Sequence, residues 1–229
     1  MKKLIVVVIV LSLFSGELIA QKNRTPKTKK EKVSYSIGVN IGKNMKTQGI
    51  DLDQGLLTQG IKDGLNSSKT AMSDKDMESA MTAFQQEMMG KMQAKQKVDG
   101  EKNAKEGEAF LDANKNKEGV ITLPSGLQYK IIKSGEGPKP TKDQTVKCNY
   151  RGTLIDGTEF DSSYKRGEPA EFPVGGVIKG WIEALQLMPV GSKWQLFIPS
   201  DLAYGPNGAG QTIGPNATLI FDIELVSIK

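Results

Sequence analysis

His, the side chain that most often carries proton transfer, is absent from this sequence, and Cys, a common metal ligand, is nearly so. It has no His and a single Cys, Cys148, in 229 residues. Catalytic triads built on His and metal sites ligated by His are therefore excluded, and one Cys cannot replace those ligands or form an internal disulfide. Cys148 alternates in phase with Val146 and Tyr150, which predicts a small buried hydrophobic residue. Any chemistry must proceed without the usual titrating base.

One short helix is predicted in the C-terminal half, within residues 177–188. From Trp181 onward the apolar residues recur at helical spacing, and Pro189 followed by Gly191 ends the segment. Gly180 comes just before Trp181 and allows the backbone to approach a neighbouring element closely.

The segments on both sides of this helix alternate between apolar and polar residues, as strands with one buried face do. They are residues 145–154, 194–199 and 217–228, and the same alternation also follows Val120. Asp156-Gly157 predicts a hairpin turn. Because the apolar faces of these strands need a cover, we expect residues 120–229 to be an α+β domain, an antiparallel half-barrel sheet wrapped over one short helix.

The first 20 residues have the layout of a secretory signal peptide. Two lysines precede an apolar run that is too short to span a bilayer, and a candidate cleavage site follows Ala20. A retained membrane anchor is the alternative, because Leu18 occupies a position that usually holds a small residue. We expect an exported protein, located in the periplasm or on the outer cell surface.

The charge of the chain does not indicate a nucleic-acid partner. Removal of residues 1–20 would lower the net charge only from +5 to +4, and the lysines lack interleaved aromatic residues. Residues 21–30 are basic and are predicted to be a disordered linker.

Two short amphipathic helices are predicted within residues 31–72. Val33, Ile37, Ile41 and Met45 recur every four positions, and a second apolar stripe fits residues 54–65. Two such stripes cannot stabilise an independent domain, so we expect this region to form a homodimer.

A third and much longer helix is predicted over residues 73–114. Its apolar stripe, which is rich in Met, ends at Met92; the methionines are read either as flexible core residues or as an adaptable surface for unfolded chains. Beyond Met92 the sequence is polar and contains Gly100 and Gly107, each costing about 1 kcal/mol of helix stability relative to Ala. The second half of this helix is therefore predicted to be an exposed rod.

Several motifs of the C-terminal half, in this order and spacing, resemble the FKBP-type peptidyl-prolyl isomerases. They are Tyr150-Arg151-Gly152, the run from Asp156 to Ser163, Val177-Ile178-Lys179-Gly180-Trp181, Ala203-Tyr204-Gly205, and the run from Ala217 to Leu225. Motifs of the N-terminal half are similar to the macrophage infectivity potentiator branch, whose members are exported homodimers joined by their N-terminal helices. These motifs are Ser34-Tyr35-Ser36-Ile37-Gly38, Gly42-Lys43-Asn44, Gln48-Gly49-Ile50-Asp51, and the run from Leu123 to Tyr129.

The resemblance implies an apolar pocket that needs no cofactor and no metal. It assigns catalytic roles to Trp181 as the floor, to the Ile178 N–H and the Tyr204 hydroxyl as donors to substrate carbonyls, and to Asp161 at the polar edge. The implied set of catalytic residues is Tyr150, Phe160, Asp161, Ile178, Trp181, Tyr204 and Phe221, and that of substrate-binding residues is Phe172, Val177 and Ile213. Each aromatic residue alone would be explained better by core packing, and only their joint occurrence favours the pocket.

The resemblance also implies partners. These are proline-containing unfolded or folding polypeptides and, as possible ligands, macrolides such as rapamycin. Ala170 stands where many family members have an aromatic residue, and Ala209 where several have His; these departures concern macrolide binding and substrate preference. Two functions remain open: an isomerase that accelerates protein folding outside the cytoplasm, and an ATP-independent chaperone that holds unfolded chains in the cleft of the dimer.

Overall fold

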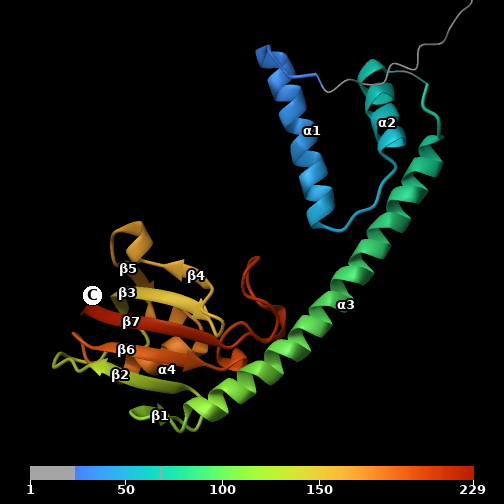
Figure 1. The fold of residues 1–229 in the computed structure, drawn as a ribbon. Coiled ribbons are helices and arrows are strands. Elements are labelled where there is room, and N and C mark those ends of the chain that lie inside the picture. Colours follow the sequence, from blue (N-terminus) through green and yellow to red (C-terminus); the bar gives the residue numbers. More distant parts are fainter. Residues whose placement is uncertain (1–23, 68) are drawn as a thin grey trace, which may run out of the picture. The chain divides into compact units, whose positions relative to one another are not determined.

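The computed structural model describes residues 24–67 and 69–229, which fall into two compact units (Figure 1). The first unit is Met1–Asp74 and the second is Lys75–Lys229. The predicted signal peptide, residues 1–20, lies outside the described residues. None of the described helices is both long enough and apolar enough to cross a membrane.

The first unit contains two helices, α1 (Lys29–Thr47) and α2 (Gln54–Asn66). The predicted linker, residues 21–30, extends two residues too far, because α1 already begins at Lys29. The cause is a capping box: the Glu31 N–H donates to Thr28 Oγ1 (3.2 Å), and the Thr28 N–H donates to the Glu31 carboxylate (3.0 Å). Neither helix has a buried residue within the described chain, and Ile37 is 55% exposed.

Helix α3 (Asp74–Asn114) runs over 41 residues, and one face of its second half packs against the rest of the second unit. Asn114 is buried and donates from Nδ2 to Gln128 Oε1 (2.9 Å), while the rings of Phe110 and Phe197 lie 5.9 Å apart. The prediction of an exposed rod is therefore wrong for this face. Its residues have the 3-4 spacing of a helical stripe, but most of them are small or polar: Gly100, Asn103, Gly107, Phe110 and Asn114.

A sheet of seven strands, paired only in the antiparallel sense, makes up most of the second unit. Its order is β1-β2-β6-β7-β3-β4, and β5 also pairs with β3. The bounds are β1 Val120–Thr122, β2 Gln128–Lys133, β3 Thr145–Leu154, β4 Glu159–Ser162, β5 Ala170–Pro173, β6 Lys193–Ile198 and β7 Leu219–Ile228. The predicted α+β class is confirmed.

The core of this unit lies between the sheet and helix α4 (Lys179–Leu187). The face of α4 toward the core carries Trp181, which is 4% exposed, and Leu185, which is fully buried. A Cβ at Gly180 would lie 2.6 Å from Ile198 Cγ2, so only Gly lets the helix approach β6 this closely. Cys148 is fully buried, and burial raises the pKa of its thiol to about 12, as expected for a core residue.

Candidate active site

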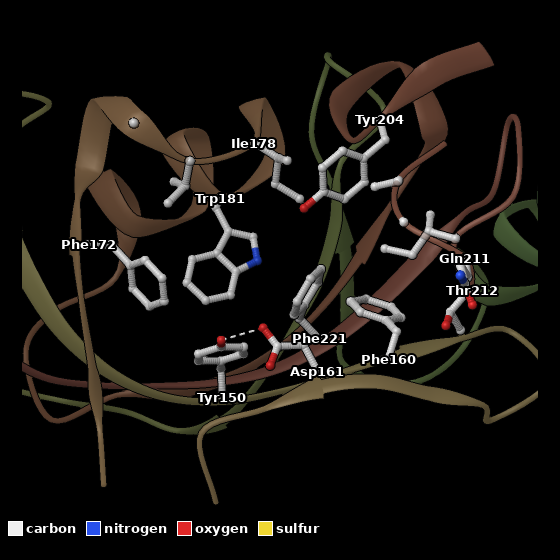
Figure 2. A pocket seen from close by; sticks show the side chains of 15 residues that line it. Tyr150, Phe160, Asp161, Phe172, Ile178, Trp181, Tyr204, Gln211, Thr212 and Phe221 are labelled. Atoms are coloured by element: carbon white, nitrogen blue, oxygen red, sulfur yellow. Dashed lines mark hydrogen bonds between the residues drawn. The ribbon is translucent and has the colours of Figure 1, made fainter. Parts of the chain in front are cut away.

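A half-open cavity of about 700 Å³ lies beside the N-terminal end of α4 (Figure 2). Residues of β3, β4, β5, β7, α4 and the segment 203–214 line it. Every residue that the resemblance assigned to the pocket is in this lining: Tyr150, Phe160, Asp161, Phe172, Val177, Ile178, Trp181, Tyr204, Ile213 and Phe221. The structure thus brings all ten together, while their individual roles stay predictions.

Trp181 is the centre of the aromatic wall. Its ring meets the rings of Tyr150, Phe172 and Phe221 edge to face, at centroid distances of 5.4, 5.4 and 5.2 Å. Phe160 packs in the same way on Phe221, at 5.4 Å. Aromatic pairs prefer this geometry, which holds each ring in place without filling the space in front of it. The result is a preformed apolar pocket.

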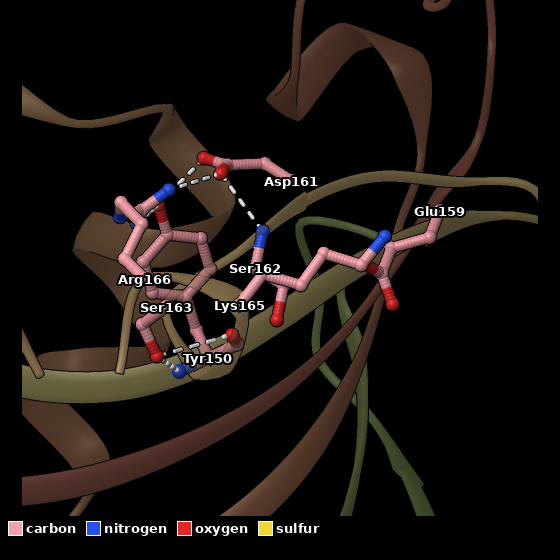
Figure 3. Close-up of polar contacts among 7 residues, drawn as sticks. All are labelled: Tyr150, Glu159, Asp161, Ser162, Ser163, Lys165 and Arg166. Carbon is pink, nitrogen blue, oxygen red and sulfur yellow. Dashed lines mark hydrogen bonds and ion pairs between the residues drawn. The ribbon is translucent and has the colours of Figure 1, made fainter. Parts of the chain in front are cut away.

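The polar edge of the pocket is a short hydrogen-bond network (Figure 3). The Tyr150 hydroxyl donates to Asp161 Oδ2 (2.5 Å), and the Ser162 N–H donates to Asp161 Oδ1 (2.8 Å). Arg166 donates to both Asp161 Oδ1 (2.6 Å) and the Tyr150 hydroxyl (2.6 Å), and its guanidinium lies over the Tyr150 ring. Asp161 is therefore fixed from three sides.

This network moves the pKa values of Asp161 and Tyr150 in opposite directions. Burial alone would raise the pKa of Asp161, but the hydrogen bonds from Tyr150 and Arg166 outweigh it, so the pKa lies below its ordinary value. Burial, together with the hydrogen bond to Asp161, raises the pKa of Tyr150. Near neutral pH the carboxylate is ionised and the phenol protonated, so neither group is poised to transfer a proton.

The two residues predicted to donate hydrogen bonds to substrate, Ile178 and Tyr204, both line the cavity. Ile178 is the N-cap of α4, and the first N–H groups of a helix have no acceptor within it. Figure 2 shows the Tyr204 hydroxyl pointing into the cavity, and Tyr204 is 41% exposed. Their role as donors to a bound chain stays a prediction.

Two parts of the site were missed from the sequence. Arg166 lies in the short 3₁₀ helix Tyr164–Arg166, where its charge resembles that of any surface residue. The second is most of the loop that forms one side of the cavity: the resemblance assigns Ile213 to the pocket and marks Ala209 as a departure, but Gly210, Gln211 and Thr212 also line the cavity. Ala170 is not among the lining residues, whereas Ala209 is.

An antiparallel sheet packed on one short helix, with an aromatic pocket beside that helix, is the domain of a class of prolyl isomerases. Residues 137–226 match the family described as FKBP-type peptidyl-prolyl cis-trans isomerase, and residues 30–131 match the domain amino terminal to it. The chain belongs to the FKBP-type peptidyl-prolyl cis-trans isomerases, as the resemblance predicted.

Relatives match over almost the whole chain. The outer membrane protein MIP of Legionella longbeachae is 49% identical, and the peptidyl-prolyl cis-trans isomerase Mip of Coxiella burnetii is 44% identical; each match covers 100% of this chain and 99% of the relative. The crystal structure of FkpA from Escherichia coli aligns with a TM-score of 0.67 at 38% identity, covering 90% of this chain and 99% of that one.

Proposed function

We propose that the protein isomerises X-Pro bonds of unfolded or folding polypeptides outside the cytoplasm, and that it does so by non-covalent binding of the twisted amide in the cavity beside α4. The observation that carries this proposal is the set of edge-to-face rings around Trp181, which leaves an apolar space open to solvent on one side.

The physical demand of the reaction fits such a pocket. Rotation about the prolyl amide costs about 18 to 20 kcal/mol because resonance is lost, yet no covalent bond is broken. The twisted amide has a less polar carbonyl than the planar one, so an apolar, water-poor site favours it over the ground state. Trp181 would form the floor under the proline ring, and the Ile178 N–H and the Tyr204 hydroxyl would hold the neighbouring carbonyls.

The direct test is the cis-to-trans relaxation of a short proline-containing peptide in the presence of the full-length protein. We expect a catalysed rate that is proportional to protein concentration. No acceleration by folded protein would reject the proposal.

Export is part of the proposal, and the apolar run at the N-terminus and the name of the Legionella relative support it. We expect the mature protein to begin near Gln21. The intact mass of protein purified from its native host decides this, because retention of residues 1–20 would contradict cleavage.

A homodimer formed by residues 31–72 is also proposed. Val33, Ile37 and Ile41 lie along α1 at four-residue spacing and are exposed within the described chain, which favours burial by a second copy.

We expect Ile37→Asp to yield a monomer that keeps its activity on a short peptide, because a carboxylate in an apolar interface cannot be buried cheaply. Ser36→Asp adds the same charge to an exposed neighbouring position outside the stripe and is the control. Light scattering measures the mass, and an unchanged dimer mass for Ile37→Asp would contradict the proposed interface.

Chaperone activity is the second candidate function. It is favoured by the exposed methionines of α3, among them Met81, Met89 and Met92, since Met adapts to varied apolar partners. An isomerase-inactive variant that still suppresses aggregation of an unfolded protein would show that clients bind outside the pocket. Macrolide binding stays a prediction.

A further inference from the structure

We propose that the second half of α3 is a working part of the isomerase site, in which Asn103 and Gly107 are positioning residues for the loop that walls the pocket. The inference rests on the proposed function. It concerns the loop 205–217, whose middle residues line the cavity from Ala209 to Ile213. Asn103 and Gly107 precede the sheet by more than ten positions and do not line the cavity.

The loop is closed on itself near its two ends. The Asn216 N–H donates to the Gly205 carbonyl (2.8 Å), and Asn216 holds a left-handed φ of 54°. Within the loop, Ala209 and Ile213 pair through N–H to carbonyl bonds of 2.8 and 3.2 Å. The position of residues 209–213 therefore depends on where the stem of the loop, residues 214–217, and the adjoining Thr218 are held.

Helix α3 holds that stem by two side-chain hydrogen bonds. Asn103 Nδ2 donates to the Pro215 carbonyl (2.8 Å), and Asn216 Nδ2 donates in return to the Gly100 carbonyl (3.3 Å). The partners are 112 and 116 residues apart in the sequence. Pro has no backbone N–H, so its carbonyl is the one backbone group through which Pro215 can be held.

Two glycines let the helix come close enough for these bonds. A Cβ at Gly100 would lie 3.2 Å from Pro215 Cβ, and a Cβ at Gly107 would lie 2.3 Å from Thr218 Oγ1. Gly90, earlier in α3, has no described atom within 4 Å of the same ideal position. Gly107 lowers the stability of the helix relative to Ala, but any larger residue at this position would collide with Thr218. Gly107 therefore identifies the point where α3 contacts the stem of the loop.

Apart from the Asn216–Gly205 bond and the Ala209–Ile213 pair, the sequence of the loop favours flexibility. Gly208 and Gly210 both have left-handed φ values, of 62° and 58°, and glycine loses more backbone freedom on ordering than any other residue. Residues 208–213 can hold a fixed position beside a bound substrate only if another element of the fold restrains them. Helix α3 supplies that support from the side of the stem.

The test compares two substitutions on the contact face with two matched controls in full-length protein. Gly107→Ala is paired with Gly90→Ala, since both add one methyl group to α3. Asn103→Ala is paired with Lys105→Ala, which truncates an exposed side chain two residues away. Two quantities are measured for each: kcat and KM on a short proline-containing peptide, and the hydrogen exchange of the Ala209 and Ile213 amides.

We expect both contact variants to lower kcat/KM by about three- to tenfold, since sub-ångström to ångström misplacement of a binding wall is costly, and to speed exchange at Ala209 and Ile213. The two control variants should match the wild type in kcat/KM and in the hydrogen exchange of these amides. In the Gly107→Ala background, Thr218→Ala should recover part of the lost kcat/KM, because it removes Oγ1, which the added methyl group would meet at 2.3 Å, and leaves Thr218 Cβ at 3.2 Å.

A purely structural contact predicts something else: a lower melting temperature with kcat/KM equal to that of the controls. That result, or faster exchange without loss of kcat/KM, would overturn the proposal, as would a loss of kcat/KM in Gly107→Ala that Thr218→Ala does not reduce. If Gly107→Ala does not fold, Asn103→Ala decides alone. Failure of the proposed function is distinguishable, because the wild type would then show no catalysis.

Discussion

A variant carrying both Tyr150→Ala and Asp161→Ala should lose about 100-fold in kcat/KM on a short proline-containing peptide, because it loses one wall of the pocket and the polar edge together. Tyr150 contacts Trp181 and Phe172 edge to face, and its hydroxyl donates to Asp161. Removing both residues leaves neither of them without the other, and Arg166, which donates to both, is 47% exposed and can be solvated by water instead. Peptide kinetics at matched protein concentration measure the loss.

The isosteric variant carrying Tyr150→Phe and Asp161→Asn is the control. It keeps the shape of the wall and removes the phenol and the charge, so the difference between the two variants separates apolar contact from polar contact. If binding of the twisted amide by apolar contact dominates, the isosteric variant should retain most of the activity. Wild-type activity in the folded double-alanine variant would contradict the proposed pocket.

The same experiment has a pH arm. The pKa of Asp161 lies below and that of Tyr150 above its ordinary value, so between about pH 6 and 8 the first stays ionised and the second protonated. With no His in the sequence, kcat/KM should be nearly flat over this range. Because the pKa of Asp161 is lowered in the folded protein, Asp161 stabilises the fold at every pH above its ordinary pKa. This stabilisation is lost only as the pH falls through the lowered pKa, so the free energy of unfolding should not change with the ionisation of Asp161 between about pH 6 and 8. A bell-shaped profile would indicate an unidentified general base.

The elements that could be predicted from the sequence are those with strong periodicity or a strong local signal. The alternation in β3 and β7 and the apolar spacing after Trp181 are local patterns, and each appears in the structure as the predicted element. The ten pocket residues came from a family resemblance, because no local pattern distinguishes Phe160 in a pocket wall from a phenylalanine in a core.

What could not be predicted depends on partners far along the chain. Gly107 appears in the sequence as a helix-weakening residue, and only the Thr218 side chain, 111 positions later, explains it. Asn103 is equally uninformative until Pro215 is placed beside it. A search for apolar periodicity does not detect a stripe of small and polar residues, which is why the second half of α3 was expected to be exposed. The capping box at Thr28 is the opposite case, since both of its residues, Thr28 and Glu31, are close enough in the lysine-rich segment to predict the start of α1.

Trp181→Ala should lower the free energy of unfolding of the second unit by about 3 to 5 kcal/mol, the largest effect on stability expected from one substitution in the pocket. Trp181 is 4% exposed and touches three other rings, and truncation would leave a cavity that those rings cannot fill without losing their edge-to-face geometry. Urea unfolding followed by circular dichroism measures the change. Loss of activity in this variant would not by itself locate the active site, because unfolding gives the same result.

Trp181→Phe resolves that ambiguity. Phenylalanine keeps an aromatic floor and most of the buried contact, so the cost in stability should be smaller than for Trp181→Ala, while the smaller ring leaves a gap beneath a bound proline. Trp194→Phe is the matched control: Trp194 is equally buried, but it stacks on Tyr129 away from the pocket lining. If Trp181 is the floor, kcat/KM should fall several-fold in Trp181→Phe and stay near the wild type in Trp194→Phe at comparable losses of stability. Equal kcat/KM in the two variants would mean that Trp181 only supports the core, and the floor of the site would have to be sought elsewhere in the lining.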